Sequence, residues 1–151
     1  MRTIVIGIGN LLRCDDGAGI HVISRLEELR VPIDILDVAM GSIEILEAMK
    51  GYDEAYIVDA IESGGKPGTV SLVNLTEGTP PNISYSHGVN LATTLLLGRH
   101  LYGDQLPKKI TLIAIEAADT LTLSERCTPD VEQAIDRVVE EILSHQHPLP
   151  S

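Results

Sequence analysis

Three apolar segments of this sequence, each with the composition of a buried β-strand, run into aspartates. The first is followed by Asp15 and Asp16. The second carries Asp37 near its end, and the third is followed directly by Asp59. Because ligands in open α/β sheets bind beyond the carboxyl ends of the strands, we expect these acids at one edge of a sheet. A later loop is long enough to bring His87, at the start of a predicted helix, to the same edge.

Such an arrangement favours the binding of a divalent metal ion. Carboxylates gathered at one apolar edge repel each other, and a cation removes that repulsion. Two carboxylate oxygens and one imidazole nitrogen suit a borderline metal such as nickel, zinc, manganese or iron. The sequence therefore makes Asp16, Asp59 and His87 candidate metal ligands.

Each of these three residues also has a structural interpretation. Asp16, in the first turn of a predicted helix, can complement the positive end of that helix. Asp59 can form an Asx-turn into the following loop, and His87 can cap a helix or face solvent. The occurrence of all three at one sheet edge favours a site over three separate structural roles, although their spacing is not a metal signature by itself.

Other catalytic motifs are incomplete in this sequence. Gly7-Ile8-Gly9 follows a strand as in a dinucleotide-binding loop, but Leu12 stands where the third glycine belongs. The acids that come next also oppose a pyrophosphate at the helix start. Cys14 is a poor nucleophile because neighbouring negative charge raises the pKa of a thiol, and no serine lies in a GxSxG elbow.

The composition fits one soluble domain. With 151 residues, 44% of them hydrophobic, the chain can bury a sizeable core, which must be aliphatic because Phe and Trp are absent. A net charge of −11 opposes nucleic acid and anionic lipid. Two cysteines are too few for a disulfide framework, and no apolar run is long enough to span a membrane. We therefore expect a cytoplasmic protein with no nucleic-acid and no membrane partner.

Hydrophobic periodicity predicts that strands and helices alternate along the chain. The fourth strand follows the third after residues 61–68, which are too few for a crossover helix, so we expect it to run antiparallel to the third. Residues 1–151 are predicted to form one domain with a frayed tail at 145–151. Its fold is an α/β three-layer sandwich, with helices on both faces of a mostly parallel five-stranded sheet that has one antiparallel strand. The expected strands are 3–8, 33–39, 56–58, 69–75 and 109–117, and the expected helices are 17–29, 43–49, 88–102 and one that begins at Thr128-Pro129.

Residues 7–19, GIGNLLRCDDGAG, resemble the opening motif of the hydrogenase maturation endopeptidases. These proteases trim the C-terminal extension from the large-subunit precursor of nickel–iron hydrogenases. The resemblance spans about residues 2–140, and its further segments are Val58-Asp59-Ala60, Pro67-Gly68-Thr69, Ser86-His87, Ile115-Glu116, Leu123-Ser124 and Thr128-Pro129-Asp130-Val131.

The resemblance implies an α/β sandwich with one antiparallel strand, in agreement with the element order above. It also implies that Asp16, Asp59 and His87 contact nickel already delivered to the precursor, and that cleavage of the tail follows. Whether the metal polarises the scissile carbonyl or lowers the pKa of an attacking water stays open. We assign a catalytic role to Asp16 and, as a weaker accessory acid, to Asp37.

Two departures from the family pattern concern the subgroup rather than the activity. The family often has Asp-Gly-Gly-Thr after the second strand, whereas residues 37–41 read DVAMG. The fifth strand often ends in Glu-Pro or Gln-Pro, whereas Glu116 is followed by Ala117. The different loop after Asp37 is expected to affect the choice of precursor.

We therefore expect an endopeptidase that removes the C-terminal extension of a nickel–iron hydrogenase large-subunit precursor after nickel insertion. The substrate would supply the nickel, other divalent metals can substitute for it, and the protein would be a monomer or a weak dimer. The alternative is a non-enzymatic nickel checkpoint or chaperone that binds the loaded precursor without cutting it. Both need the same ligands, so the sequence does not separate them.

Overall fold

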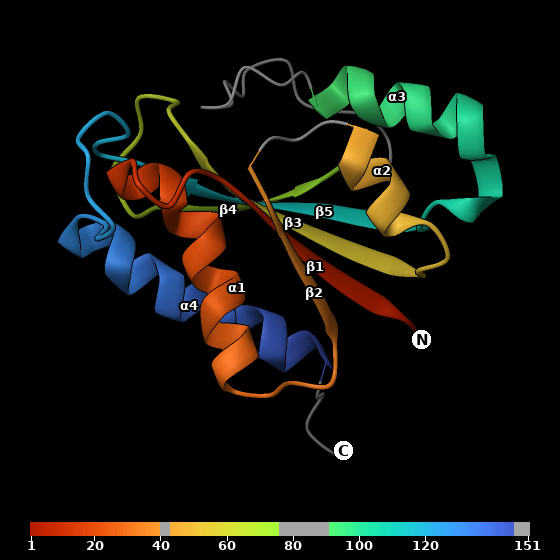
Figure 1. The fold of residues 1–151 in the computed structure, drawn as a ribbon, viewed down its shortest axis with the longest axis horizontal. Helices are drawn as coiled ribbons and strands as arrows, with labels where there is room; N and C mark the ends of the chain where they lie inside the picture. The colour runs from red at the N-terminus through yellow and green to blue at the C-terminus, as the bar shows by residue number, and fades with distance from the viewer. Residues whose placement is uncertain (40–42, 76–90, 147–151) are drawn as a thin grey trace.

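The computed structural model describes residues 1–39, 43–75 and 91–146 (Figure 1). Within these ranges the chain forms five strands and four α-helices, together with two short 3-10 helices. The strands are β1 (Thr3–Ile8), β2 (Asp34–Val38), β3 (Glu54–Ile61), β4 (Val70–Asn74) and β5 (Lys109–Glu116). The helices are η1 (Cys14–Gly17), α1 (Ala18–Glu28), α2 (Ile43–Met49), α3 (Leu91–Tyr102), η2 (Gly103–Gln105) and α4 (Pro129–Gln146).

The strands form one mixed sheet in the order β2-β1-β3-β5-β4. Parallel pairs join β1 to β2, β1 to β3 and β3 to β5, and only β4 is antiparallel within the described chain. β4 therefore runs opposite to β3, as predicted, but it pairs with β5 and not with β3. The burial of these strands explains the order: β5 is buried at seven of its eight residues and takes an inner position, while the partly exposed β4 forms the edge.

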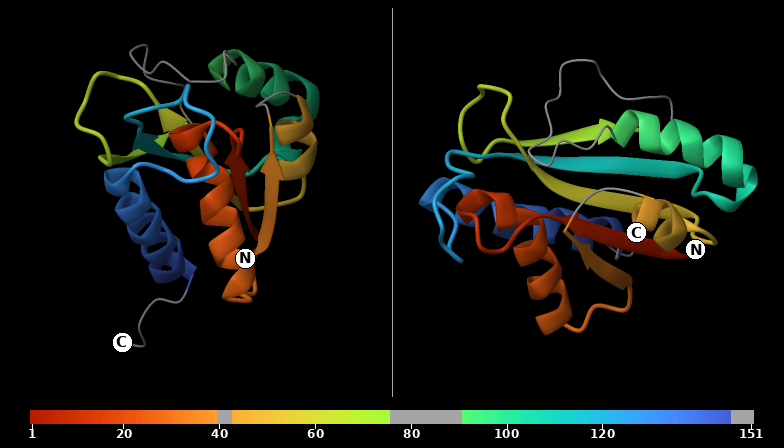
Figure 2. Two further views of the ribbon diagram at one scale, coloured as in Figure 1. Left: turned by 60° about the vertical axis from the view of Figure 1, so that its left-hand side comes forward. Right: turned by 45° about the horizontal axis from the view of Figure 1, so that its top comes forward.

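Helices cover both faces of the sheet, as Figure 2 shows. On one face, α2 and α3 pack over alternate residues of the central strands, including Ile6, Ile57 and Leu112. On the other, α1 and α4 pack over the residues between them, including Val5 and Ile113. Both cores are almost entirely aliphatic, which confirms the expectation from composition. No helix in the described part of the chain has the length and apolar character needed to cross a membrane.

The observed boundaries differ from the predicted ones at a few positions. β3 continues two residues past Asp59, so this acid lies within the strand and not after it. α4 includes His145 and Gln146, which were predicted to belong to the tail, and the rest of that tail lies outside the described residues. Thr128 precedes α4 as expected. Its hydroxyl donates a hydrogen bond to the Asp15 carboxylate. These shifts leave the predicted order of elements unchanged.

Candidate active site

The 3-10 helix η1 between β1 and α1 holds Asp16 at the carboxyl end of the sheet. Its side chain is only 4% exposed. The backbone N–H of Asn10 donates to Asp16 Oδ2 at 3.1 Å, and the backbone N–H of Asp16 donates to the carbonyl of Arg13 at 3.0 Å. The turn from β1 into η1 therefore fixes both the backbone and the carboxylate of Asp16.

Three glycines allow η1 and the start of α1 to lie directly on the strands. A Cβ on Gly9 would come within 2.1 Å of the carbonyl oxygen of Asp16, and a Cβ on Gly7 within 2.3 Å of that of Gly19. A Cβ on Gly19 would in turn lie 2.4 Å from the carbonyl oxygen of Val58. Real side chains do not tolerate such distances to backbone atoms. The glycine motif after β1 thus serves close packing that positions Asp16.

Asp59 lies on β3 just beyond the point where that strand stops pairing with β1. The last registered pair between the two strands is Gly7 with Val58. Asp59 is 2% exposed and lies two residues from both Ile57 and Ile61, which belong to the core under α2 and α3. Its side chain therefore lies on that face of the sheet.

The structure brings Asp16 and Asp59 to the same end of the sheet. η1, which carries Asp16, packs against β3, which carries Asp59. α1 also packs against β3, so closely that a Cβ on Gly19, one helical turn after Asp16, would lie 2.4 Å from the carbonyl oxygen of Val58, the residue before Asp59. The two acids are 43 residues apart in the sequence, and both are almost fully removed from solvent, so a charge on either carboxylate is screened weakly.

Asp37 is placed differently from the other two acids. It lies near the end of β2, opposite Gly7 of β1, and is exposed. Its neighbours Leu36 and Val38 pack with the core under α2 and α3, whereas Ile35 packs with the opposite core. Alternation along β2 puts Asp37 on the side of Ile35, across the sheet from Asp59. The structure does not bring these two acids together on one face.

His87 lies outside the described residues, so its predicted role as a ligand stays a prediction. α3 begins four residues later at Leu91, which is 2% exposed in the core on the face that carries Asp59. Among residues 1–39, 43–75 and 91–146, no group of three or more His, Cys, Asp or Glu side chains is placed to hold a metal ion. The described part of the chain therefore holds the two carboxylates, Asp16 and Asp59, of the three proposed metal ligands. Their oxygens suit a divalent metal ion.

Asp15, adjacent to Asp16, has different hydrogen-bond partners, and its structural role was not predicted from the sequence. It is fully buried and accepts backbone N–H groups from Ala118, Asp119 and Thr128 at 2.9, 3.0 and 2.7 Å. The Thr128 hydroxyl also donates to it, at 2.8 Å. The Asp15 carboxylate thus joins η1 by hydrogen bonds to the loop between β5 and α4.

Glu116 organises a second loop at the same end. It is 3% exposed, and its carboxylate accepts the backbone N–H groups of Ser63 and Gly65 at 2.9 and 3.0 Å, together with the Ser63 hydroxyl. These bonds hold the loop between β3 and β4 against the end of β5. Ile115-Glu116 was predicted to belong to the family resemblance, but the role of the Glu116 carboxylate in holding this loop becomes apparent only in the structure.

Both cysteines are free and buried. Burial, reinforced by the negative charge of Asp15, raises the pKa of the Cys14 thiol. Burial and then the charges of Asp15 and Glu132 raise the pKa of the Cys127 thiol to about 12. Neither thiol is ionised near pH 7, which confirms that Cys14 is a poor nucleophile.

Figure 1 shows the loops that follow β1, β3 and β5 meeting at one end of the sheet. A three-layer α/β fold with buried acids at the carboxyl ends of its strands is a known setting for ligand and metal chemistry. The geometry defines a class of protein: an α/β protein with a carboxylate site between η1 and β3.

Comparison with known proteins identifies the family. A family model described as hydrogenase maturation protease matches residues 20–145, a range that includes Asp59 and His87 and starts four residues after Asp16. The hydrogenase 2 maturation protease of Escherichia coli is 31% identical over 151 residues, which cover 95% of this chain and 90% of that protein. A putative hydrogenase maturation protease of Methanocaldococcus jannaschii is 31% identical over 92% of this chain and 95% of its own length.

Solved structures agree with this result. The maturating endopeptidase HybD from E. coli has a TM-score of 0.78 and 29% identity, with 97% of this chain and 93% of that chain covered. The NiFe hydrogenase maturation protease HybD from Thermococcus kodakarensis, at 24% identity, has the same fold with a TM-score of 0.80 over 96% of this chain and 99% of its own. The chain belongs to the hydrogenase maturation protease family.

Proposed function

We propose that this chain is an endopeptidase that removes the C-terminal extension of a nickel–iron hydrogenase large-subunit precursor once nickel has been inserted. Membership of the hydrogenase maturation protease family supports the reaction and the substrate. The observation that carries the site assignment is the pair of buried carboxylates, Asp16 and Asp59, held at one end of the sheet by η1 and β3.

Nickel carried by the precursor is part of the substrate, and Asp16, Asp59 and His87 are its proposed ligands on this chain. Two carboxylates and an imidazole fit a borderline metal. When bound, the metal supplies Lewis acidity toward the scissile carbonyl or an attacking water. Asp37 is the proposed accessory acid. Because it is exposed on the other face of the sheet, the substrate would have to reach around the end of β2 to contact it.

The residues of this chain contribute position and charge to the reaction. The hydrogen bond from the Asn10 N–H orients the Asp16 carboxylate, and the absence of Cβ atoms at Gly7, Gly9 and Gly19 lets η1 and the start of α1 lie directly on the strands. Burial of both acids strengthens their attraction for a cation relative to an exposed pair. Since the Cys14 and Cys127 thiols stay protonated, a metal-linked hydrolysis accounts for the activity better than cysteine chemistry.

The primary test is the intact mass of a nickel-loaded large-subunit precursor from the same organism, before and after addition of this protein. We expect loss of a C-terminal peptide from the loaded precursor and no loss from a nickel-free sample. A nickel-dependent complex without any mass change would instead identify the non-enzymatic checkpoint. Absence of both cleavage and complex formation would refute the assignment to that precursor.

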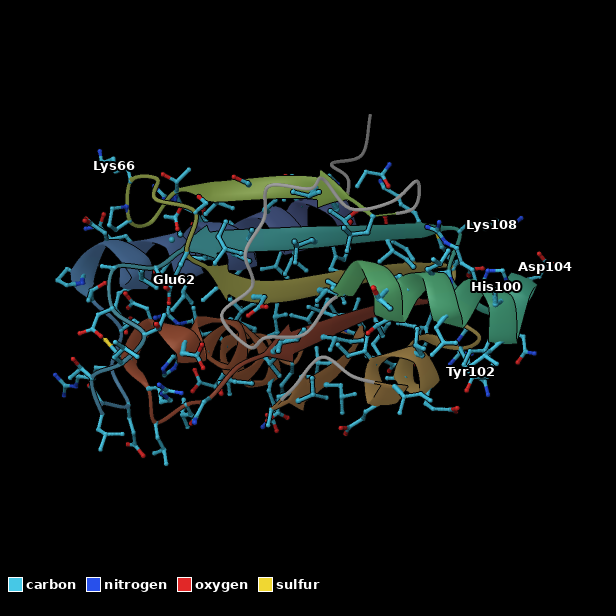
Figure 3. The ribbon with its side chains drawn as sticks, turned by 90° about the horizontal axis from the view of Figure 1, so that it is seen from above. Glu62, Lys66, His100, Tyr102, Asp104 and Lys108 are labelled. Atoms are coloured by element: carbon cyan, nitrogen blue, oxygen red, sulfur yellow. The ribbon has the colours of Figure 1, made fainter. Side chains whose placement is uncertain are left out.

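Variants locate the site within the same assay. Asp59→Asn and His87→Ala are expected to abolish processing while the far-UV circular dichroism stays unchanged. His100→Ala is the matched control, because His100 is exposed on α3 and lies at the opposite end of the molecule from the loop residue Glu62 (Figure 3). Processing by His87→Ala at the wild-type rate would remove His87 from the proposed ligand set.

We also propose that the protein works in the cytoplasm as a monomer or weak dimer. Its two free cysteines are consistent with a reducing compartment. Cell fractionation tests the location, and sedimentation of the purified protein over a range of concentrations tests the oligomeric state.

A further inference from the structure

Four leucines are exposed on two loops at the end of the sheet that carries the candidate site. Leu11 and Leu12, in the loop after β1, are 37% and 56% exposed. Leu121 and Leu123, in the loop between β5 and α4, are 75% and 81% exposed. A single exposed leucine is common on protein surfaces, but several gathered together indicate an interaction site. We call these four residues the leucine surface.

The two loops are joined along their backbones. Ser124 donates its N–H to the carbonyl of Leu12 at 2.9 Å, and Cys14 donates its N–H to the carbonyl of Ser124, also at 2.9 Å. Arg13 and Ser124 form a parallel bridge between the loops. These bonds place the backbone of Leu12 beside that of Ser124, the residue after Leu123, so the two loops that carry the exposed leucines lie side by side.

The two loops that carry the leucine surface are held in place by hydrogen bonds. Asp15 fastens the first loop to Ala118, Asp119 and Thr128 of the second through the hydrogen bonds described above. Asp119 accepts the N–H groups of Leu121 and Thr122, each at 2.9 Å, and so fixes the turn that displays Leu121. Because the loops are already ordered, a partner that binds there pays little additional ordering entropy.

Part of the leucine surface belongs to the same turn that positions Asp16. Leu11 and Leu12 lie between Asn10, whose N–H holds the Asp16 carboxylate, and the start of η1. The Cα of Leu11 lies 3.0 Å from the position a Cβ on Gly17 would occupy, directly after Asp16. A macromolecule that brings a scissile bond to Asp16 would meet these leucines on the same side.

An acidic cavity adjoins the leucine surface and gives it a preferred type of partner. The cavity has a volume of about 460 Å³ and includes Leu121 in its lining. The described residues that line it include Glu62, Glu116 and Asp119 and no lysine or arginine. A segment with apolar side chains and one basic side chain matches both features. A second copy of this chain, with its own net charge of −11, matches the cavity poorly.

We propose that Leu11, Leu12, Leu121 and Leu123 form the docking surface for the large-subunit precursor, with a basic side chain of the docked segment in the cavity beside Glu62 and Asp119. This inference rests on the proposed function, because the precursor is its occupant. These leucines would select the substrate at a distance from the metal ligands.

The test compares two double variants. Leu121→Ser with Leu123→Ser removes half of the leucine surface. The matched control is Leu96→Ser with Leu101→Ser, because these α3 leucines are 58% and 55% exposed. Leu101 lies between His100 and Tyr102 in the sequence. Figure 3 shows these two residues at the opposite end of the molecule from Glu62. Far-UV circular dichroism and thermal unfolding establish that both variants fold.

The measurements are the Kd for nickel-loaded precursor and the KM and kcat of its cleavage. For the Leu121/Leu123 variant we expect Kd and KM to rise about tenfold or more, while kcat stays unchanged. The control should bind like the wild type. Glu62→Lys should also weaken binding, and it should reduce the salt dependence of the association rate.

The outcomes separate this inference from the proposed function. If the wild type cleaves the precursor and the Leu121/Leu123 variant keeps its Kd and KM, the docking surface is refuted while the function stands. Equal loss in the α3 control moves the docking surface to α3 and also refutes the inference. If the wild type binds without cleaving and the Leu121/Leu123 variant loses binding, the docking surface is supported and the endopeptidase assignment fails. If the wild type neither binds nor cleaves, both proposals fail.

Discussion

Replacement of Asp15 should damage the fold far more than replacement of its neighbour Asp16. Asp15 is fully buried and accepts three backbone N–H groups and one hydroxyl. Hydrogen bonds to a charged group contribute about 1.5–3 kcal/mol each. Water can replace part of this loss because Ala118 is exposed. We therefore expect Asp15→Ala to lower the free energy of unfolding by about 3–5 kcal/mol.

The assay is equilibrium unfolding in urea, followed by circular dichroism. With a slope of about 2 kcal/mol/M for a chain of this size, the expected loss shifts the midpoint by roughly 2 M. Asp16→Asn is the matched variant, since it keeps an oxygen that can accept the N–H of Asn10. Its expected cost is below about 1 kcal/mol. Processing of the precursor should nonetheless be lost in Asp16→Asn.

Similar midpoints for the two variants would refute this reasoning. So would an Asp15→Ala protein that unfolds within about 0.5 M of the wild type. Either result would mean that the loop between β5 and α4 is held mainly by contacts other than the Asp15 carboxylate. Asp15→Asn, which keeps the size of the side chain, serves to separate loss of charge from loss of volume.

Two further predictions concern stability. Gly19→Ala should destabilise the protein by about 2 kcal/mol, because the new Cβ would meet two backbone carbonyls at 2.4 and 2.6 Å. Gly98→Ala is the control and should cost less, since its Cβ meets only leucine side-chain ends. Stability should also fall as the pH rises from about 9 to 12, because burial raises the pKa of both Cys127 and Tyr56 to about 12, so unfolding releases their protons. A flat pH profile in urea unfolding over that range, or fast labelling of Cys127 by a thiol reagent at pH 8 in the folded protein, would contradict this account.

Local sequence patterns determined the order of the elements and the end of the sheet at which chemistry is possible. Apolar β-branched runs and helical spacing predicted the five strands and four α-helices that the structure describes, with boundary shifts of a few residues, but not the two 3-10 helices η1 and η2. The short connection 61–68 predicted the one antiparallel strand, because a parallel return needs a crossover. Since parallel strands end at a common edge, the acids after β1 and within β3 were predictable as neighbours.

Strand order was decided by the tertiary structure. The sequence placed β4 next to β3 in the chain, but the two are separated in the sheet by β5, which arrives about 35 residues after β4. An inner position buries both faces of β5 and leaves the more polar β4 at the edge. That choice minimises exposed apolar area over the whole sheet, and no local window of sequence contains it.

The roles of the individual acids also required the fold. Asp15 and Asp16 are adjacent, yet successive residues of a 3-10 helix point about 120° apart, so one faces the loop before α4 and the other the turn after β1. The face occupied by Asp37 was equally hard to predict, because each side of β2 carries one aspartate and at least one apolar residue. A sequence names residue types and their periodicity, whereas the direction in which each carboxylate points depends on which distant backbone donors the folded chain brings to it.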